Sequence, residues 1–160
     1  MQIPLYQVDA FASGPFRGNP AAVCPLDDWL PDEMLQAIAE ENNLSETAYY
    51  VRENGRYRLR WFTPTVEVDL CGHATLAAAS IIGAPRVEFD SRSGELVVER
   101  DDTLYVLDFP ARPPRECPED PQLFEALGAK PGKLLTAVDY LCVFDTEGQV
   151  RALRPDMTKL

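Results

Sequence analysis

The sequence predicts an α+β fold in which a strongly curved, mostly antiparallel β-sheet wraps around a central helix. Segments rich in β-forming residues follow one another along most of the chain. Two longer segments have helical periodicity instead. The second begins at Gly72 and carries the small residues Ala74, Ala77, Ala78 and Ala79, which allow strands to approach a helix closely. Helices packed on antiparallel strands define this fold class.

The composition limits the kinds of partner that the protein can have. The chain has 160 residues, of which 46% are hydrophobic, enough for one domain of ordinary size or for part of a larger protein. Its formal net charge is −11, from 26 acidic and 15 basic residues. A surface so acidic disfavours binding to nucleic acid or to an anionic membrane. We therefore expect a small-molecule or protein partner.

The four cysteines indicate free thiols in a reducing compartment. They are Cys24, Cys71, Cys117 and Cys142, and they form neither a C-x-x-C motif nor a cysteine–histidine cluster. The spacing therefore predicts neither a metal site nor a disulfide framework. The sequence also shows no secretory leader and no apolar run of membrane-spanning length, so we expect a cytoplasmic protein.

The first elements are a hairpin and a helix. Residues 3–11 and 20–25 are predicted strands, joined by a loop that contains glycine and proline. Asn19 precedes Pro20, which holds it in an extended conformation. Its amide can then face a ligand, although a turn asparagine is the more common role. From Pro31 the apolar residues recur with helical spacing, and this helix ends at residues 42–43.

The middle of the chain predicts a second hairpin, the central helix and a meander. Residues 48–51 and 57–62 form strands joined at an Asn-Gly turn. A short strand then runs into a helix over about residues 72–82, which Gly83 terminates. The meander is predicted from three further β segments, at residues 86–89, 95–99 and 103–109.

The last third of the chain has weaker sequence signals for secondary structure. Residues 110–121 include five prolines and are predicted to form a surface connection, followed by a short helix over residues 121–127. Residues 135–150 are predicted to hold two more strands, one on each side of residues 146–148. Residues 154–160 have the signature of a helix start, so we expect the chain to end within an element.

Three residues near the central helix could carry chemistry. His73, the only histidine, is placed at a helix N-terminus, which favours its neutral form and attracts anions. Glu46 lies where a helix gives way to a strand, at an expected sheet edge where burial would raise its pKa. Cys71 is either a thiolate activated by the helix terminus or an inert thiol. Taken singly, a surface glutamate and a structural histidine are the more common roles.

The order of several motifs resembles the PhzF-like isomerase family of phenazine biosynthesis. The matching motifs are Val8-Asp-Ala-Phe11, Gly18-Asn-Pro-Ala-Ala-Val23, Asn43-Leu-Ser-Glu-Thr47, Arg60-Trp-Phe-Thr-Pro64, Glu67-Val-Asp-Leu-Cys-Gly-His-Ala-Thr75, Asp90-Ser-Arg-Ser-Gly94 and Asp108-Phe-Pro-Ala111. The likeness covers nearly the whole chain. Each motif is weak alone, and their fixed order makes the likeness specific.

The resemblance implies a diaminopimelate-epimerase-like fold of two pseudo-symmetric halves, with the active site in the cleft between them. Residues 1–160 would be the N-terminal half, ending at or just inside the start of a second half. The family is cofactor-independent and moves a proton on a small carboxylic acid, and we expect a homodimer. The implied catalytic residues are Glu46 and His73. The implied substrate-binding residues are Asn19, Ser45, Cys71 and Gly72.

The sequence departs from the family pattern in a way that keeps other functions open. It has no Gly-Glu-Asp-Pro-type motif, which the second half of the family normally carries. The chain is therefore either part of a longer protein or a genuine half. One alternative is a binding or assembly module without catalysis, because half a cleft excludes water poorly. Another is an amino-acid racemase or epimerase.

Overall fold

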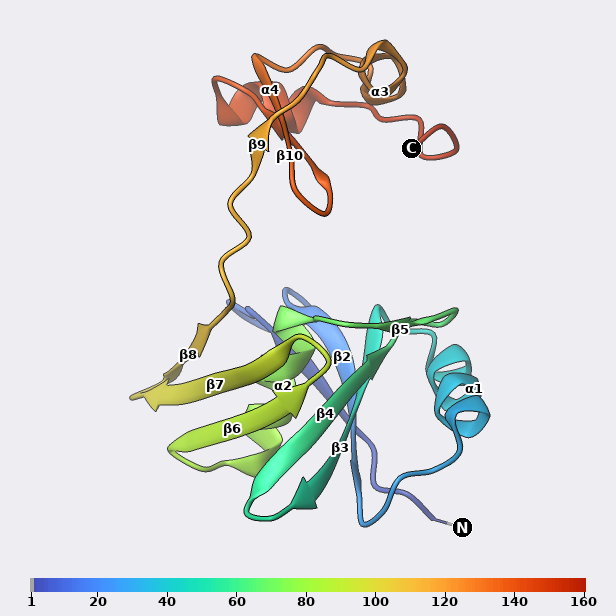
Figure 1. Ribbon diagram of the computed structural model, residues 1–160, viewed down its shortest axis with the longest axis vertical. Coiled ribbons are helices and arrows are strands. Elements are labelled where there is room, and N and C mark those ends of the chain that lie inside the picture. The colour runs from blue at the N-terminus through green and yellow to red at the C-terminus, as the bar shows by residue number, and fades with distance from the viewer. Residues whose placement is uncertain (1) are drawn as a thin grey trace. The chain divides into compact units, whose positions relative to one another are not determined.

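The computed structural model describes residues 2–160, which form two compact units that divide after Pro110 (Figure 1). The first unit contains a large sheet and two helices. Its strands are β1 (Tyr6–Ala10), β2 (Asn19–Leu26), β3 (Glu46–Glu53), β4 (Arg56–Phe62), β5 (Glu67–Val68), β6 (Arg86–Ser91), β7 (Gly94–Asp101) and β8 (Leu104–Asp108). Its helices are α1 (Asp32–Asn42) and α2 (Gly72–Ile82).

The sheet of the first unit follows the order β1-β2-β3-β4-β6-β7-β8, with β5 paired to β4. Most neighbours are antiparallel, as predicted, and the β3–β4 hairpin and the β6–β7–β8 meander are confirmed. Two pairs are parallel: β2 with β3, and β4 with β6. A helix lies between the strands of each parallel pair in the sequence and returns the chain to the end where the first strand began.

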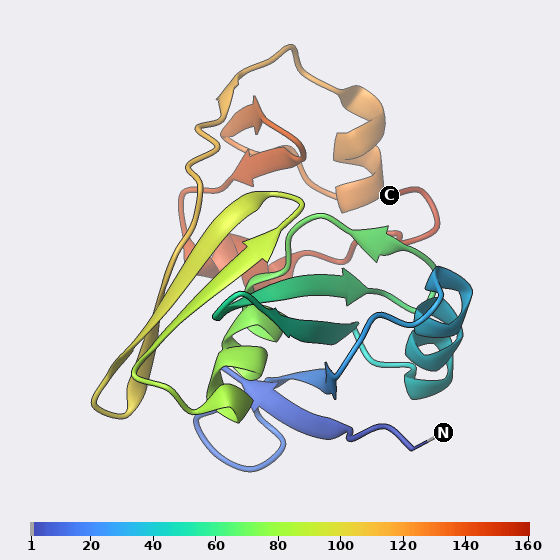
Figure 2. The same ribbon diagram turned by 60° about the horizontal axis from the view of Figure 1, so that its bottom comes forward.

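The sheet curls around α2, which forms the centre of the core (Figures 1 and 2). The four alanines of α2 that the sequence singled out are almost completely buried. Large side chains from the surrounding strands pack on this helix, among them Trp61, Phe89 and Leu96. Small residues on the helix thus leave room for large ones on the sheet. The predicted α+β class and the central position of α2 are confirmed.

Replacing Ala78 by leucine is expected to destabilise the first unit by about 1–3 kcal/mol, because added methylene groups overpack a filled core. Ala78 has no exposed surface. Ala37→Leu makes the same change at an exposed position of α1 and serves as the control. Urea unfolding followed by tryptophan fluorescence measures the difference. Equal unfolding midpoints for the two variants would show that the space around α2 is not filled.

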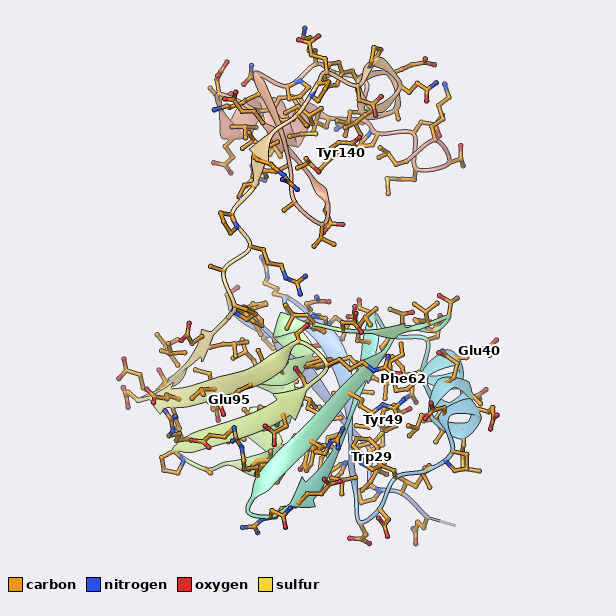
Figure 3. The ribbon with its side chains drawn as sticks, in the orientation of Figure 1. Trp29, Glu40, Tyr49, Phe62, Glu95 and Tyr140 are labelled. Carbon is orange, nitrogen blue, oxygen red and sulfur yellow. The ribbon has the colours of Figure 1, made fainter. Side chains whose placement is uncertain are left out.

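Helix α1 covers the opposite face of the sheet. Its buried residues Leu35 and Ala39 pack against Tyr49 and Phe62, which point toward α1 (Figure 3). The hydroxyl of Tyr49 donates a hydrogen bond to the carbonyl oxygen of Leu35 at 2.8 Å. Alternation along β3 places Ala48 and Tyr50 on the inner face and Tyr49 on the outer face. β3 is therefore buried on both sides.

The second unit, residues 111–160, has a small sheet in the order β11-β10-β9. Its strands are β9 (Arg115–Glu116), β10 (Lys133–Thr136) and β11 (Tyr140–Val143), and its helices are α3 (Pro121–Leu127) and α4 (Glu147–Ala152). The predicted helix over residues 121–127 is confirmed. β9 lies within the proline-rich segment, where we had expected only a connection.

Two predictions in the second unit are wrong. The strand expected after residues 146–148 is helix α4, because Thr146 and Gln149 form a capping box that starts a helix there. The helix expected from residue 154 is absent. Asp156 instead accepts hydrogen bonds from the backbone N–H and hydroxyl of Thr158, which stabilises a turn. Across residues 2–160, no helix is both long enough and apolar enough to span a membrane.

Candidate active site

The candidate site is built at the N-terminus of α2, whose bounds agree with the helix that the sequence predicted over about residues 72–82. Cys71 is the N-cap residue and has an extended backbone. The hydroxyl of Thr75 donates a hydrogen bond to the carbonyl oxygen of Cys71 at 2.5 Å, inside the core. This contact fixes the first turn, so the direction in which the side chain of His73 leaves the helix is fixed as well.

Glu46 approaches the same helix end from the sheet. It is the first residue of β3, and it pairs with Ala21 of β2. Because β3 lies between β2 and β4, the expected position at a sheet edge is wrong. Glu46 lies instead at the end of an interior strand, where pairing with β2 restricts its backbone. The exposed fraction of its side-chain surface is 20%.

Glu46, Cys71 and His73 form one cluster of polar side chains. His73 Nε2 lies 3.3 Å from Glu46 Oε2, and His73 Nδ1 lies 3.4 Å from the sulfur of Cys71. Cys71 and His73 are buried. Although Nε2 and Oε2 are close, their angles do not satisfy a hydrogen bond, and neither atom has another partner among the described residues. Both atoms can therefore bond to a third group.

The thiol of Cys71 stays protonated at neutral pH. Burial raises its pKa to about 12, and the nearby carboxylate of Glu46 acts in the same direction. The backbone N–H groups of Ala74 and His73 oppose this shift without reversing it. Of the two roles that the sequence allowed, the structure favours the inert thiol over the activated thiolate.

Two further predicted residues lie at the same end of the sheet. Asn19 is the first residue of β2, and the parallel pairing of β2 with β3 brings it beside Ser45. The Ser45 hydroxyl donates to Asn19 Oδ1 at 3.4 Å, and both residues are exposed. A Cβ atom on the preceding Gly18 would lie 2.7 Å from the carbonyl oxygen of Ala10. Only glycine allows this close approach, which holds Asn19 in place.

One residue of the site was not singled out by sequence reasoning. A Cβ atom on Gly72 would lie 2.9 and 3.0 Å from two ring carbons of Phe109, so this ring packs directly on the start of α2. Phe109 follows β8 and keeps 41% of its surface exposed. The motif that begins at Asp108 was the available signal, but its sequence position did not show that it meets Gly72.

The same cluster contains three potential metal ligands. One atom each from Glu46, Cys71 and His73 lies within 4.8 Å of the others. A thiol binds a metal as the thiolate, so a metal ion here would have to displace the proton of Cys71.

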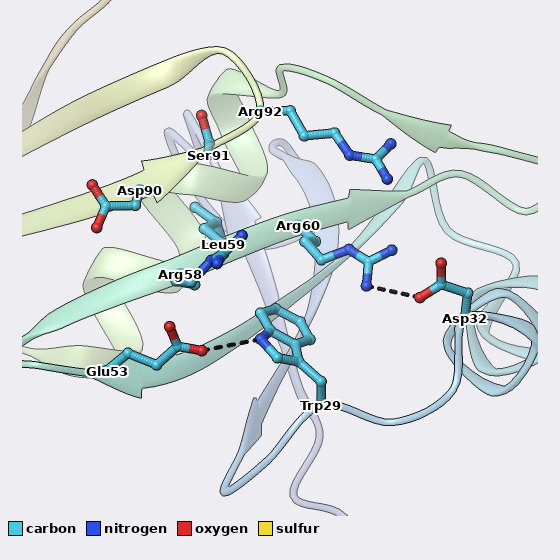
Figure 4. Close-up of a pocket in the computed structure, with 9 residues that line it drawn as sticks. All are labelled: Trp29, Asp32, Glu53, Arg58, Leu59, Arg60, Asp90, Ser91 and Arg92. Atoms are coloured by element: carbon cyan, nitrogen blue, oxygen red, sulfur yellow. Dashed lines mark hydrogen bonds and ion pairs between the residues drawn. The ribbon is translucent and has the colours of Figure 1, made fainter.

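A separate hollow of about 340 Å³ lies on the outer face of the sheet (Figure 4). Arg60 dominates it. Its guanidinium makes two bonds with Glu67, at 2.7 and 2.8 Å, and one with Asp32 at 2.9 Å, and it lies over the ring of Trp29. The two carboxylates balance the positive charge of the guanidinium, and their hydrogen bonds raise its pKa. They link the loop before α1 to β4 and β5, so we assign this cluster a structural role.

The fold of this chain matches the folds of solved structures. A Predicted Epimerase from Pseudomonas aeruginosa matches 96% of this chain and 63% of its own, with a TM-score of 0.77 and 20% identity, which shows a shared fold. A phenazine biosynthesis protein of the PhzF family from Enterococcus faecalis is more similar. The match covers 100% of this chain and 64% of the Enterococcus faecalis chain, with a TM-score of 0.90 and 45% identity.

The sequence comparisons identify the family. Residues 8–142 match the family described as Phenazine biosynthesis-like protein, and the chain belongs to this family. An uncharacterized isomerase from Pseudomonas aeruginosa is 55% identical over the whole chain. The chain spans 64% of the length of that relative. The predicted relationship to the PhzF-like family is therefore confirmed.

Proposed function

We propose that the chain carries the acid–base residues of a cofactor-independent isomerase that moves a proton on a small carboxylic acid. The close pair formed by Glu46 Oε2 and His73 Nε2 is the observation that supports this proposal. The two atoms face each other at 3.3 Å without a hydrogen bond of their own. Similarity to relatives described as isomerases agrees with it.

In the proposed reaction, the carboxylate of Glu46 removes a proton from a carbon next to an unsaturated system. The electron pair of the broken C–H bond spreads over that system, and Glu46 then returns the proton to a different carbon. No electrons are gained or lost overall, so the reaction needs no oxidant or reductant. His73 lies close enough to Glu46 to assist the transfer.

The substrate carboxylate is proposed to bind at the start of α2. The backbone N–H of Gly72, the first residue of the helix, has no acceptor within the helix, and the positive end of the helix dipole attracts an anion. Asn19 and Ser45 supply exposed polar atoms at the same end of the sheet. Phe109 adds an apolar surface beside Gly72. The site therefore suits a small acid with an apolar part.

The proposal concerns the residues that this chain contains. The chain covers 64% of the length of the relatives described as isomerases. A racemase that uses Cys71 as its base is disfavoured, because burial keeps this thiol protonated.

Proton exchange with solvent tests the proposal. The protein is incubated in D₂O with a β,γ-unsaturated cyclohexene carboxylate, and proton NMR follows the substrate. We expect deuterium to enter a carbon of the ring as the double bond moves into conjugation with the carboxylate. The saturated cyclohexane carboxylate is the matched control and should stay unlabelled. Unlabelled unsaturated acid after prolonged incubation would contradict the proposal.

A further inference from the structure

We propose that Cys71 is a positioning residue whose S–H group donates a hydrogen bond to Nδ1 of His73 and thereby fixes the imidazole tautomer with its proton on Nε2. In this arrangement the N–H of the ring lies on the side of Glu46. The catalytic consequence rests on the proposed function, whereas the tautomer itself can be measured without any substrate.

The geometry brings the two groups together within one helical turn. The sulfur of Cys71 lies 3.4 Å from Nδ1 of His73, in the range of a hydrogen bond to sulfur. Both residues are more than nine-tenths buried, so water does not compete for this contact. The N-cap backbone of Cys71 is held by Thr75, which limits the freedom of the thiol. The contact is therefore built into the start of α2.

The direction of the hydrogen bond follows from the chemistry of the two groups. In a neutral imidazole, one ring nitrogen donates and the other accepts. The S–H group of Cys71 is a weak hydrogen-bond donor, and its sulfur lies 3.4 Å from Nδ1. It therefore offers a donor to Nδ1, and the lone pair of Nδ1 accepts it. The ring proton is then on Nε2.

The contact with Glu46 favours the same tautomer. If the proton were on Nδ1, the lone pair of Nε2 would face the carboxylate oxygen of Glu46 at 3.3 Å, and the two acceptors would repel each other. A proton on Nε2 turns this repulsion into attraction. The thiol on one side of the ring and the carboxylate on the other thus select one protonation pattern.

In this tautomer the two acid–base residues have different roles. With its proton on Nε2, His73 is a hydrogen-bond donor on the side of the reacting groups, and Glu46 is the proton acceptor. The poor alignment between Nε2 and Oε2 leaves this N–H able to donate to a substrate atom. Cys71 acts only through His73 and touches no reacting atom.

A competing arrangement is possible within the same cluster. The thiol could donate to the nearby carboxylate of Glu46 instead of to His73. Loss of the thiol would then leave the imidazole tautomer unchanged. The two arrangements therefore give opposite results in one experiment.

Nitrogen-15 NMR of the imidazole decides between them. His73 is the only histidine of the chain, so protein labelled at the ring nitrogens gives one unambiguous pair of signals. We expect the wild-type protein to show a protonated Nε2 and an unprotonated Nδ1. Cys71→Ser retains a donor and should keep this pattern. Cys71→Ala should raise the share of the tautomer protonated on Nδ1, because only the contact with Glu46 then opposes it. Cys24→Ala removes a different buried thiol and is the control.

The inference is overturned if the wild-type ring is protonated on Nδ1, or if Cys71→Ala leaves the tautomer unchanged. Cys71→Val, which fills the space without a donor, replaces the alanine variant if the latter does not fold. In the deuterium assay we expect Cys71→Ala to lower kcat by about 10-fold with little change in KM. Lack of exchange by the wild-type protein would refute the proposed reaction and leave the tautomer result standing.

Discussion

Glu46→Gln is expected to lower the rate of deuterium incorporation by about 10²–10⁴-fold, the usual contribution of a general base. The amide has nearly the same shape as the carboxylate but cannot take up the proton. The fold should tolerate the change, because the side chain is partly exposed and its Oε2 makes no hydrogen bond with the described residues. Proton NMR in D₂O measures the rate, and circular dichroism verifies the fold.

Glu53→Gln is the matched control for this variant. Glu53 lies at the opposite end of the same strand, β3, where it accepts a hydrogen bond from the indole N–H of Trp29 at 3.3 Å. A glutamine retains an oxygen that can accept this bond, so exchange should remain at the wild-type rate. The role of Glu46 is refuted if both variants exchange deuterium equally fast.

The first unit is expected to lose several kcal/mol of stability as the pH rises from about 9 to about 12. Burial raises the pKa of Cys24 from 9.0 to about 11, that of Cys71 from 9.0 to about 12, and that of Tyr50 from 10.0 to about 12. It also raises the pKa of Tyr49. The unfolded chain therefore ionises first, and rising pH favours it until the folded groups ionise too.

Chemical denaturation near neutral pH and at about pH 11 measures this loss. Both tryptophans, Trp29 and Trp61, belong to the first unit, so their fluorescence reports its unfolding alone. Cys24→Ala should weaken the pH dependence by up to about 1.4 kcal/mol per pH unit. Cys117→Ala, in the second unit, should leave it unchanged. A free energy of unfolding independent of pH over this range would contradict the assigned burial of these groups.

Local sequence patterns determined much of the first unit. The Asn-Gly turn, the bounds of α2 and the meander after it follow from turn chemistry, capping and residue periodicity, which act over a few residues. The motif order also identified the family and the six candidate site residues. The roles of these residues, the homodimer, the cytoplasmic location and the layout of residues 1–160 as an N-terminal half stay predictions.

The second unit shows where local patterns fail. Residues 133–152 contain short segments whose β propensity does not distinguish two strands followed by a helix from two strands around a turn. The capping box at Thr146 stabilises the helix. Sequence reasoning had treated this segment as a turn. Short elements are decided by such single contacts, because they have little periodicity to detect.

The sequence by itself determined that Cys71, Gly72 and His73 start a helix and that Glu46 lies where a helix gives way to a strand. Only the tertiary structure decided that Glu46 enters the site from an interior strand and meets the imidazole, that the thiol lies on the other side of the ring, and that Phe109 packs on Gly72. The physical reason is that the contacts of Glu46 with His73 and of Phe109 with Gly72 join segments far apart in the chain. Strand order and sheet curvature around α2 set them, and no local pattern encodes either.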